Sequence, residues 1–145
     1  MAILFSREPK ICKEILSRQT SHITTQSKPK YAPPFKCYLY CESSNSNQFL
    51  NCKNSVDFYL EEKDTLGGQG PGLYRRVNNT VACEFVCNSI TQYTDGSYDL
   101  EIVDLRFFEK YVSLKDFILS ESQNKDKLLA APEDWSYVLE RKELI

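Results

Sequence analysis

The stretch Thr80–Tyr93, TVACEFVCNSITQY, decides the fold of this chain. β-branched, aromatic and small apolar residues dominate it, a composition typical of a buried strand. Asp95-Gly96 follows at once and is a strong hairpin signal, and Tyr98–Phe108 then has the composition of a second strand. The sequence therefore predicts two long antiparallel strands joined by a tight turn. Alternation predicts that the second strand has one face with Leu100, Ile102, Asp104 and Arg106 and another with Glu101, Val103, Leu105 and Phe107.

N-terminal to this hairpin, a short apolar run leads into a helix. Ala2–Phe5 is long enough for one strand. Pro9 suits the first turn of a helix because its φ is already fixed near the helical value. The apolar stripe of that helix, at spacings of three and four, consists of Ile11, Cys12, Ile15 and Leu16. The polar, β-branched segment Ser17–Ser27 then predicts a turn and a short strand, and Phe35–Cys41 predicts another strand.

Two connecting segments carry little regular pattern. Ser43–Ser55 is rich in Asn and Ser and predicts an exposed loop, whereas Val56–Glu62 fits a helix or a strand equally well. Gly67–Gly72 holds four of the five glycines but lacks the Lys-Ser/Thr pair of a phosphate-binding loop. We expect this glycine segment to be a connection and not a phosphate site.

The C-terminal part predicts one more helix and one more strand. Ser113 with Asp116 has the spacing of a capping box, and Leu114, Phe117 and Ile118 supply an apolar face. Trp135–Glu140 reads as the last strand.

Length and composition bound the class of protein. A chain of 145 residues with 41% hydrophobic and 12% aromatic residues is expected to be one globular domain, residues 1–145. No stretch approaches the ~20 apolar residues that span a bilayer, so we expect no membrane partner. The element order predicts an α+β fold, a small curved β-barrel with two or three helices packed at its ends.

The charge of the chain is unevenly divided. Residues 1–40 hold seven Lys or Arg against two Glu, although the whole chain has a net charge of −2. A basic N-terminal portion is where an anionic ligand would bind. Ordinary scatter of surface lysines explains the same count, and the sequence does not separate the two readings.

The cysteines are interpreted as buried apolar residues. The chain has six, which are Cys12, Cys37, Cys41, Cys52, Cys83 and Cys87. Within a flat strand, positions four apart share a face but lie about 13 Å from each other, too far for one zinc ion to bridge. We therefore expect reduced, buried cysteines, no metal or other cofactor, and a reducing, cytoplasmic compartment.

A set of short motifs carries a family resemblance. In chain order they are Ser6-x-x-Pro9-Lys10-x-Cys12, Ile15-x-Ser17, Lys28-Pro29-Lys30, Pro34-Phe35-Lys36-Cys37-Tyr38-x-Tyr40-Cys41, Cys83-Glu84-Phe85-Val86-Cys87, Asp104-Leu105-Arg106 and Pro132-x-x-Trp135-x-Tyr137-Val138. Together they resemble the ASCH-like proteins of bacteriophages and mobile elements. The resemblance spans nearly the full chain and implies a PUA-like barrel whose cleft, in relatives, faces RNA or modified nucleotides.

The segment after the first helix departs from that family. Relatives usually place glycine, two basic residues, Thr, an apolar residue, an acid, an apolar residue and arginine where this chain reads Arg18–Thr25, RQTSHITT. Related amidohydrolases that cleave an acetylated cytidine use a Lys, a Thr and a Glu. Their Lys position corresponds to Thr20 and their Thr position to Ile23, which leaves only Glu84. One carboxylate cannot act as both nucleophile and proton carrier, so we expect no amidohydrolase activity.

The lone histidine gives no complete catalytic set. His22 has no second histidine for a metal cluster or a serine triad, although a Cys-His dyad is formally possible. We interpret it as a surface or cleft-lining residue. Trp135 reads either as a core aromatic or as a stacking platform for a base. Arg75 and Arg76, beside Tyr74, read as a solvated loop end or as a phosphate contact.

Two function classes remain open from the sequence. In the first, the chain is a non-catalytic module that binds RNA or a nucleotide; its expected site residues are Lys10, Lys28, Lys30, Arg75, Arg76, Glu84 and Trp135. In the second, it is a phage protein in the host cytoplasm that binds a host protein such as a defence nuclease, as an anti-CRISPR or other counter-defence protein would. The acidic remainder of the chain favours the second class because it could mimic nucleic acid, and the basic N-terminal portion favours the first.

Overall fold

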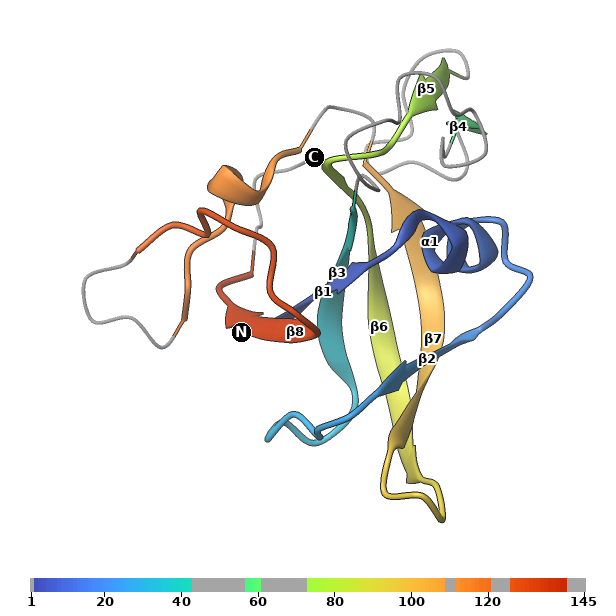
Figure 1. The fold of residues 1–145 in the computed structure, drawn as a ribbon, viewed down its shortest axis with the longest axis vertical. Coiled ribbons are helices and arrows are strands. Elements are labelled where there is room, and N and C mark those ends of the chain that lie inside the picture. Colours follow the sequence, from blue (N-terminus) through green and yellow to red (C-terminus); the bar gives the residue numbers. More distant parts are fainter. Residues whose placement is uncertain (1, 43–56, 61–72, 109–111, 121–125, 141–145) are drawn as a thin grey trace.

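The computed structural model describes residues 2–42, 57–60, 73–108, 112–120 and 126–140. In chain order, the elements are β1 (Ala2–Arg7), α1 (Pro9–Leu16), β2 (His22–Thr25), β3 (Phe35–Cys41), β4 (Asp57–Leu60), β5 (Leu73–Arg76), β6 (Thr80–Gln92), β7 (Tyr98–Phe107), a 3-10 turn (Leu114–Asp116) and β8 (Trp135–Val138). Six strands form one sheet in the order β2-β7-β6-β3-β1-β8, which curls into a half-barrel, and β4 pairs with β5 (Figure 1). Strands β1 and β3 run parallel, and the other neighbours in the large sheet are antiparallel.

This architecture agrees with a small, barrel-like α+β domain made mostly of sheet. The expected helices are only partly present, because the described residues hold one α-helix and not two or three. Helix α1 begins at Pro9 as predicted and buries Cys12, Ile15 and Leu16. Strands β2, β3 and β8 also lie where the sequence placed them.

The prediction of a helix after Ser113 is wrong. The Asp116 carboxylate does accept the Ser113 N–H, at 2.9 Å, but the turn ends after one 3-10 cycle. Phe117 is extended there, and its fully buried ring packs 4.8 Å from the ring of Tyr38. Ile118 then bridges to Lys127 instead of continuing a helix. Burial of Phe117 against the sheet therefore overrides the local capping signal.

The β6–β7 hairpin confirms the strongest prediction. Its turn places Gly96 at φ +90°, a region that only glycine enters without strain. The Asp95 carboxylate accepts both the N–H and the hydroxyl of Ser97, at 2.9 and 2.6 Å. These two hydrogen bonds lower the pKa of Asp95.

The predicted faces of β7 hold only up to a bulge. Glu84 pairs with Arg106 and Val86 with Val103, so two residues of β7 lie opposite one residue of β6. Asp104, inside this bulge, has φ 53°, in the left-handed region. The side-chain alternation therefore reverses after Asp104. As a result Phe107 packs in the same core as Leu100 and Ile102, which the sequence had assigned to the opposite face.

Each face of the large sheet carries its own apolar core. One core lies between the sheet and α1, where Cys12, Ile15 and Leu16 meet Phe5, Leu39 and Phe85, among others. The second lies on the other face and is built from Ala2, Leu4, Tyr38, Val81, Phe108, Val112, Phe117, Leu128 and Val138. The five described cysteines are free and buried in the first core, as predicted.

The segment whose period was unsettled contains β4, so part of it is a strand. The expected loop Ser43–Ser55, the glycine segment Gly67–Gly72 and Cys52 lie outside the described residues.

Candidate functional site

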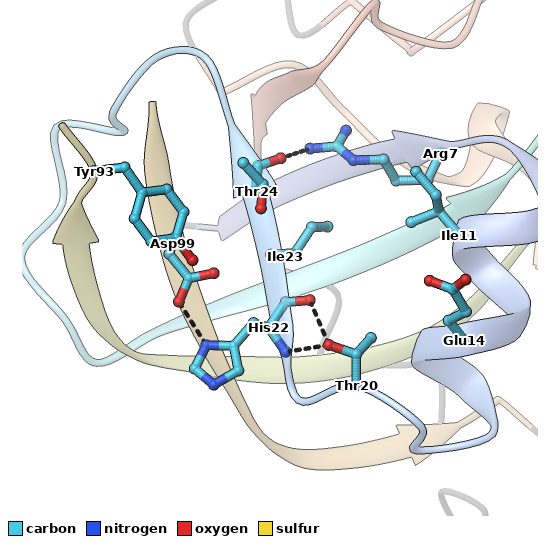
Figure 2. Close-up of a pocket in the computed structure, with 9 residues that line it drawn as sticks. All are labelled: Arg7, Ile11, Glu14, Thr20, His22, Ile23, Thr24, Tyr93 and Asp99. Atoms are coloured by element: carbon cyan, nitrogen blue, oxygen red, sulfur yellow. Dashed lines mark hydrogen bonds and ion pairs between the residues drawn. The ribbon is translucent and has the colours of Figure 1, made fainter. Parts of the chain in front are cut away.

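A pocket of about 470 Å³ opens between α1 and β2. Figure 2 shows Ile11 and Glu14 on the α1 side, the His22 ring with Tyr93 and Asp99 on the far side, and β2 between them. The complete lining is Arg7, Ile11, Glu14, Thr20, His22, Ile23, Thr24, Tyr93 and Asp99. Two of these side chains are aliphatic, and the others are polar or charged.

The helix faces the pocket because of the spacing of its residues. Since 3.6 residues make one turn, Ile11 and Glu14 lie on one side of α1 while Cys12 and Ile15 lie on another. Cys12 and Ile15 are buried in the core beneath, whereas Ile11 and Glu14 are partly exposed. Packing of α1 on the sheet therefore turns its Glu14 side toward the pocket.

A tight connection brings the chain from α1 to β2. Arg18 adopts φ 61°, and its N–H donates to Ile15 O at 3.0 Å, which ends the helix. Ile102 of β7 donates its N–H to Ser21 O at 2.7 Å. The Thr20 hydroxyl oxygen accepts the His22 N–H at 3.2 Å. These contacts fix the start of β2 at the edge of the sheet.

His22 is held by a carboxylate from the neighbouring strand. Its Nδ1 lies 2.6 Å from Asp99 Oδ2, across the β2–β7 pair in which Thr24 is directly opposite Asp99. The Tyr93 hydroxyl also bonds Asp99, and this bond raises the pKa of Tyr93. Because the Asp99 carboxylate orients Nδ1, the remaining ring nitrogen Nε2 is left to meet a ligand. The His22 side chain is 47% exposed, so a ligand can reach it.

Arg7 forms the opposite end of the pocket. Its Nη2 donates to Thr24 O at 2.9 Å, and Nη1 donates to Asp134 O at 2.8 Å. Nη2 also lies 2.6 Å from Asp134 Oδ1, so the guanidinium charge is balanced by a carboxylate outside the pocket lining. Arg7 thereby joins β1, β2 and the residue before β8.

The pocket offers both donors and acceptors but no surplus of positive charge. Arg7 is neutralised by Asp134, and the lining includes the carboxylates of Glu14 and Asp99. Hydroxyls of Thr20, Thr24 and Tyr93 can donate or accept. This arrangement suits a neutral, planar, polar group better than a bare phosphate.

A second cluster adjoins the pocket along β8. The Gln26 N–H donates to Asp134 Oδ2 at 3.2 Å, and the Trp135 indole N–H donates to Ser27 O at 3.3 Å. The Lys30 N–H donates to the Tyr137 hydroxyl at 2.9 Å, and the Lys30 ammonium lies 4.7 Å from the centre of the Tyr137 ring. Residues 26–30 therefore lie along β8 immediately after leaving the pocket.

Some residues expected at the site lie near the pocket. Lys10 is exposed on α1 beside Ile11, and Lys28 and Lys30 are exposed on the segment after β2. Trp135 is partly buried and makes an edge contact with Tyr137, with the ring centres 4.8 Å apart. Trp135 is thus half core and half surface, between the two alternatives that the sequence left open.

Glu84, by contrast, is not brought to the pocket. It lies opposite Tyr38 and Arg106, on the sheet face that carries the second core. Its carboxylate lies 3.4 Å from the Lys36 ammonium. Arg75 and Arg76 belong to β5, and their side chains lie outside the described part of the chain.

The sequence left His22 as a surface or cleft-lining residue, did not include it among the expected site residues, and missed its partners. No sequence motif marks these partners, because strand pairing and the curl of the sheet bring them together from four separate segments. They are Arg7, Glu14, Tyr93 and Asp99. The hairpin prediction carried one usable signal, since Tyr93 and Asp99 flank the predicted turn.

No group of three or more His, Cys, Asp or Glu that could hold a metal ion occurs among the residues that the structure describes. In the same part of the chain, no helix is long and apolar enough to cross a membrane. Comparisons of the whole chain with family models, curated proteins and solved structures returned no match.

Proposed function

We propose that this chain is a non-catalytic, PUA-like module that binds a nucleotide of single-stranded RNA in the pocket between α1 and β2. The size and lining of the pocket carry the proposal. A volume of about 470 Å³ falls within the range of small-molecule sites, ~300–1,000 Å³. The motif resemblance described above and the curled sheet support the PUA-like assignment.

The lining fits a nucleobase. Ile11 is partly exposed and provides apolar contact for the flat face of a ring, while Glu14 and the hydroxyls of Thr20 and Thr24 can bond its edge. RNA-binding proteins commonly read unpaired bases in this way, by packing on the face and bonding at the edge. The two lining carboxylates disfavour a phosphate inside, so the charged backbone would remain at the rim.

The rim has the charge that a backbone requires. Lys10, Lys28 and Lys30 are all exposed and come from the two segments that border the pocket, α1 and the turn after β2. They lie in the basic N-terminal portion of an otherwise acidic chain. Positive side chains at the rim would attract nucleic acid, and the binding affinity should fall as the salt concentration rises.

The same geometry supports binding without catalysis. Ile23, at the position of the amidohydrolase Thr, has a hydrocarbon side chain with no nucleophilic atom, and it is buried in the core. The Thr20 hydroxyl is engaged by the His22 backbone and not by its ring. Among the described residues, the His22 ring pairs with Asp99 and with no hydroxyl or thiol. An activated nucleophile is therefore missing beside the one base.

A pocket-filling variant tests the proposal. Thr24 is exposed and lines the pocket, so Thr24→Trp is expected to occupy it without disturbing the core. Binding of the four nucleoside 5′-monophosphates and of a mixed-sequence RNA hexamer is measured calorimetrically at low salt. We expect at least a tenfold loss of affinity for whichever of them binds.

Leu129→Trp is the matched control, since Leu129 is 79% exposed and lies outside the pocket lining. It should bind like the wild type. Absence of binding to all five probes by the wild-type protein would overturn the proposal and favour the protein-binding alternative. Equal affinities of wild type and Thr24→Trp would place any binding elsewhere on the surface.

A further inference from the structure

We propose that the site has a second subsite, in which Lys28 and Lys30 bind the phosphate next to the nucleotide in the pocket. The preferred ligand is then a strand of at least two nucleotides and not a free nucleotide. This inference rests on the proposed function, because it needs a nucleotide in the pocket.

The two subsites are physically continuous. Thr24 lines the pocket, and the chain leaves it through Gln26, whose N–H donates to the same Asp134 carboxylate that pairs with Arg7. Lys28 is four residues beyond Thr24, so their Cα atoms are at most about 14 Å apart. A strand whose base enters the pocket would therefore have the lysine segment within reach of its neighbouring nucleotide.

The lysine segment is held in place by β8. The Trp135 indole donates to Ser27 O, and the Tyr137 hydroxyl accepts the Lys30 N–H. Pro29 is buried between the two exposed lysines, which anchors the backbone between them. Two backbone contacts and one buried proline fix the position of both lysines, so less entropy is lost when they bind an anion.

Charge separates the two subsites. The pocket lining carries the Glu14 and Asp99 carboxylates, and Asp134 already balances Arg7. Lys28 and Lys30 are the first two exposed cations that follow β2 along the chain. A base therefore has the better environment inside the pocket and a phosphate has the better environment outside.

The Lys30 ammonium lies 4.7 Å from the centre of the Tyr137 ring, a cation–π distance. This contact places the ammonium over the Tyr137 ring of β8. Trp135 and Tyr137 act here as positioning residues, because they hold the lysine segment and need not touch the ligand.

The test compares short ligands that differ only in their flanking nucleotides. The four nucleoside 5′-monophosphates identify the base that binds best, and a trinucleotide with that base at its centre is made as RNA and as DNA. We expect the RNA trinucleotide to bind at least tenfold more tightly than the monophosphate. Its log affinity should fall with log salt at a slope near −0.7 per phosphate contacted.

The variant Lys28→Gln with Lys30→Gln separates the subsites. It should lower trinucleotide affinity to about the level of the monophosphate, flatten the salt slope, and lower trinucleotide affinity by a larger factor than monophosphate affinity. The matched control is Lys115→Gln with Lys127→Gln, which removes the same charge from two exposed lysines elsewhere on the domain. The control should keep the trinucleotide preference.

The possible failures are distinguishable. If neither monophosphates nor trinucleotides bind, the proposed function fails and this inference fails with it. If monophosphates bind but the trinucleotide binds no better, or the lysine variant affects both equally, the second subsite alone is rejected. Equal binding of the RNA and DNA trinucleotides would keep the subsite and identify its ligand as single-stranded nucleic acid of either kind.

Discussion

The guanidinium of Arg7 lies 2.6 Å from the carboxylate of Asp134, although 127 residues separate them in the chain. The Arg7 side chain is 11% exposed, and it also donates to the backbone oxygens of Ser6, Thr24 and Asp134. The other Asp134 oxygen accepts the Gln26 N–H. One ion pair thus joins β1, β2 and the chain leading into β8 at the mouth of the pocket.

Removal of this carboxylate should destabilise the domain. Asp134→Ala leaves the largely buried Arg7 charge without its partner, and we expect a loss of about 2 kcal/mol in the free energy of unfolding. Urea denaturation followed by circular dichroism measures it. Glu133→Ala, at the exposed neighbouring residue, is the control and should change stability by less than about 0.5 kcal/mol. Equal effects of the two variants would show that the ion pair has no structural role.

The hairpin and helix α1 could be predicted because their signals are local. Asp95-Gly96 and Pro9 restrict the backbone within a few residues. The spacing of the apolar residues around them predicts the same strands and helix. The 3-10 turn at Leu114–Asp116 shows the limit of this reasoning, since a correct capping pair there was overridden by burial of Phe117. The bulge at Asp104 is a similar case: no residue pattern marks it, and it changes which side chains reach the core.

The pocket was less predictable than the fold. The sequence left open whether His22 lies on the surface or lines a cleft, and its partner Asp99 is a neighbour only through the β2–β7 register. The family resemblance suggested Glu84 as the remaining acid, whereas the β3–β6 pairing places Glu84 opposite Tyr38, with its carboxylate 3.4 Å from the Lys36 ammonium and outside the pocket lining. These contacts depend on the register between strands. The register depends on the whole sheet, so no short motif predicts it.

The hairpin turn should be sensitive to a side chain at Gly96. This residue has φ +90°, and no atom outside its immediate neighbours lies within 4 Å of the position a Cβ would occupy. Gly96→Ala should therefore cost about 1 kcal/mol through backbone strain alone. Thermal denaturation measures the loss. Gly96→Asn should cost less, since Asn tolerates positive φ better; an equal or greater loss for Asn would contradict the backbone explanation.

Alkaline pH should weaken the domain through its buried thiols. Burial raises the pKa of Cys87 to about 11 from an ordinary 9.0. In the unfolded chain this thiol ionises near pH 9, whereas in the folded chain it stays neutral until about pH 11. Raising the pH through that window therefore favours unfolding.

Urea denaturation at pH 8 and pH 10.5 tests this contribution. Cys87→Ala should lose less stability between the two pH values than the wild type loses. Other titrating groups are common to both proteins and cancel in the comparison. The same pH-dependent loss in both would show that Cys87 makes no contribution.

The protein should not release acetate from N4-acetylcytidine. If the family resemblance holds, Thr20 and Ile23 stand at the positions of the amidohydrolase Lys and Thr, and Glu84 lies away from the pocket beside Lys36. Acetate is assayed after prolonged incubation with micromolar protein. Release above the buffer blank that disappears in Glu84→Gln would contradict both the sequence argument and the placement of the site.

Asp99 should matter for nucleotide binding because it orients His22. Asp99→Asn keeps the size of the side chain but removes the charge that lies 2.6 Å from Nδ1 and accepts the Tyr93 hydroxyl. We expect about a tenfold loss of affinity for the best-binding monophosphate, the size of one hydrogen bond to a charged group. Calorimetric titration measures it.

Asp104→Asn is the charge-matched control on the same strand, since Asp104 is exposed and Asn accepts its left-handed backbone. It should leave the affinity unchanged. Tyr93→Phe, which removes only the hydroxyl, should have a smaller effect than Asp99→Asn in the same direction. If Asp104→Asn weakens binding as much as Asp99→Asn does, the effect comes from the general charge of β7 and His22 is not a ligand contact.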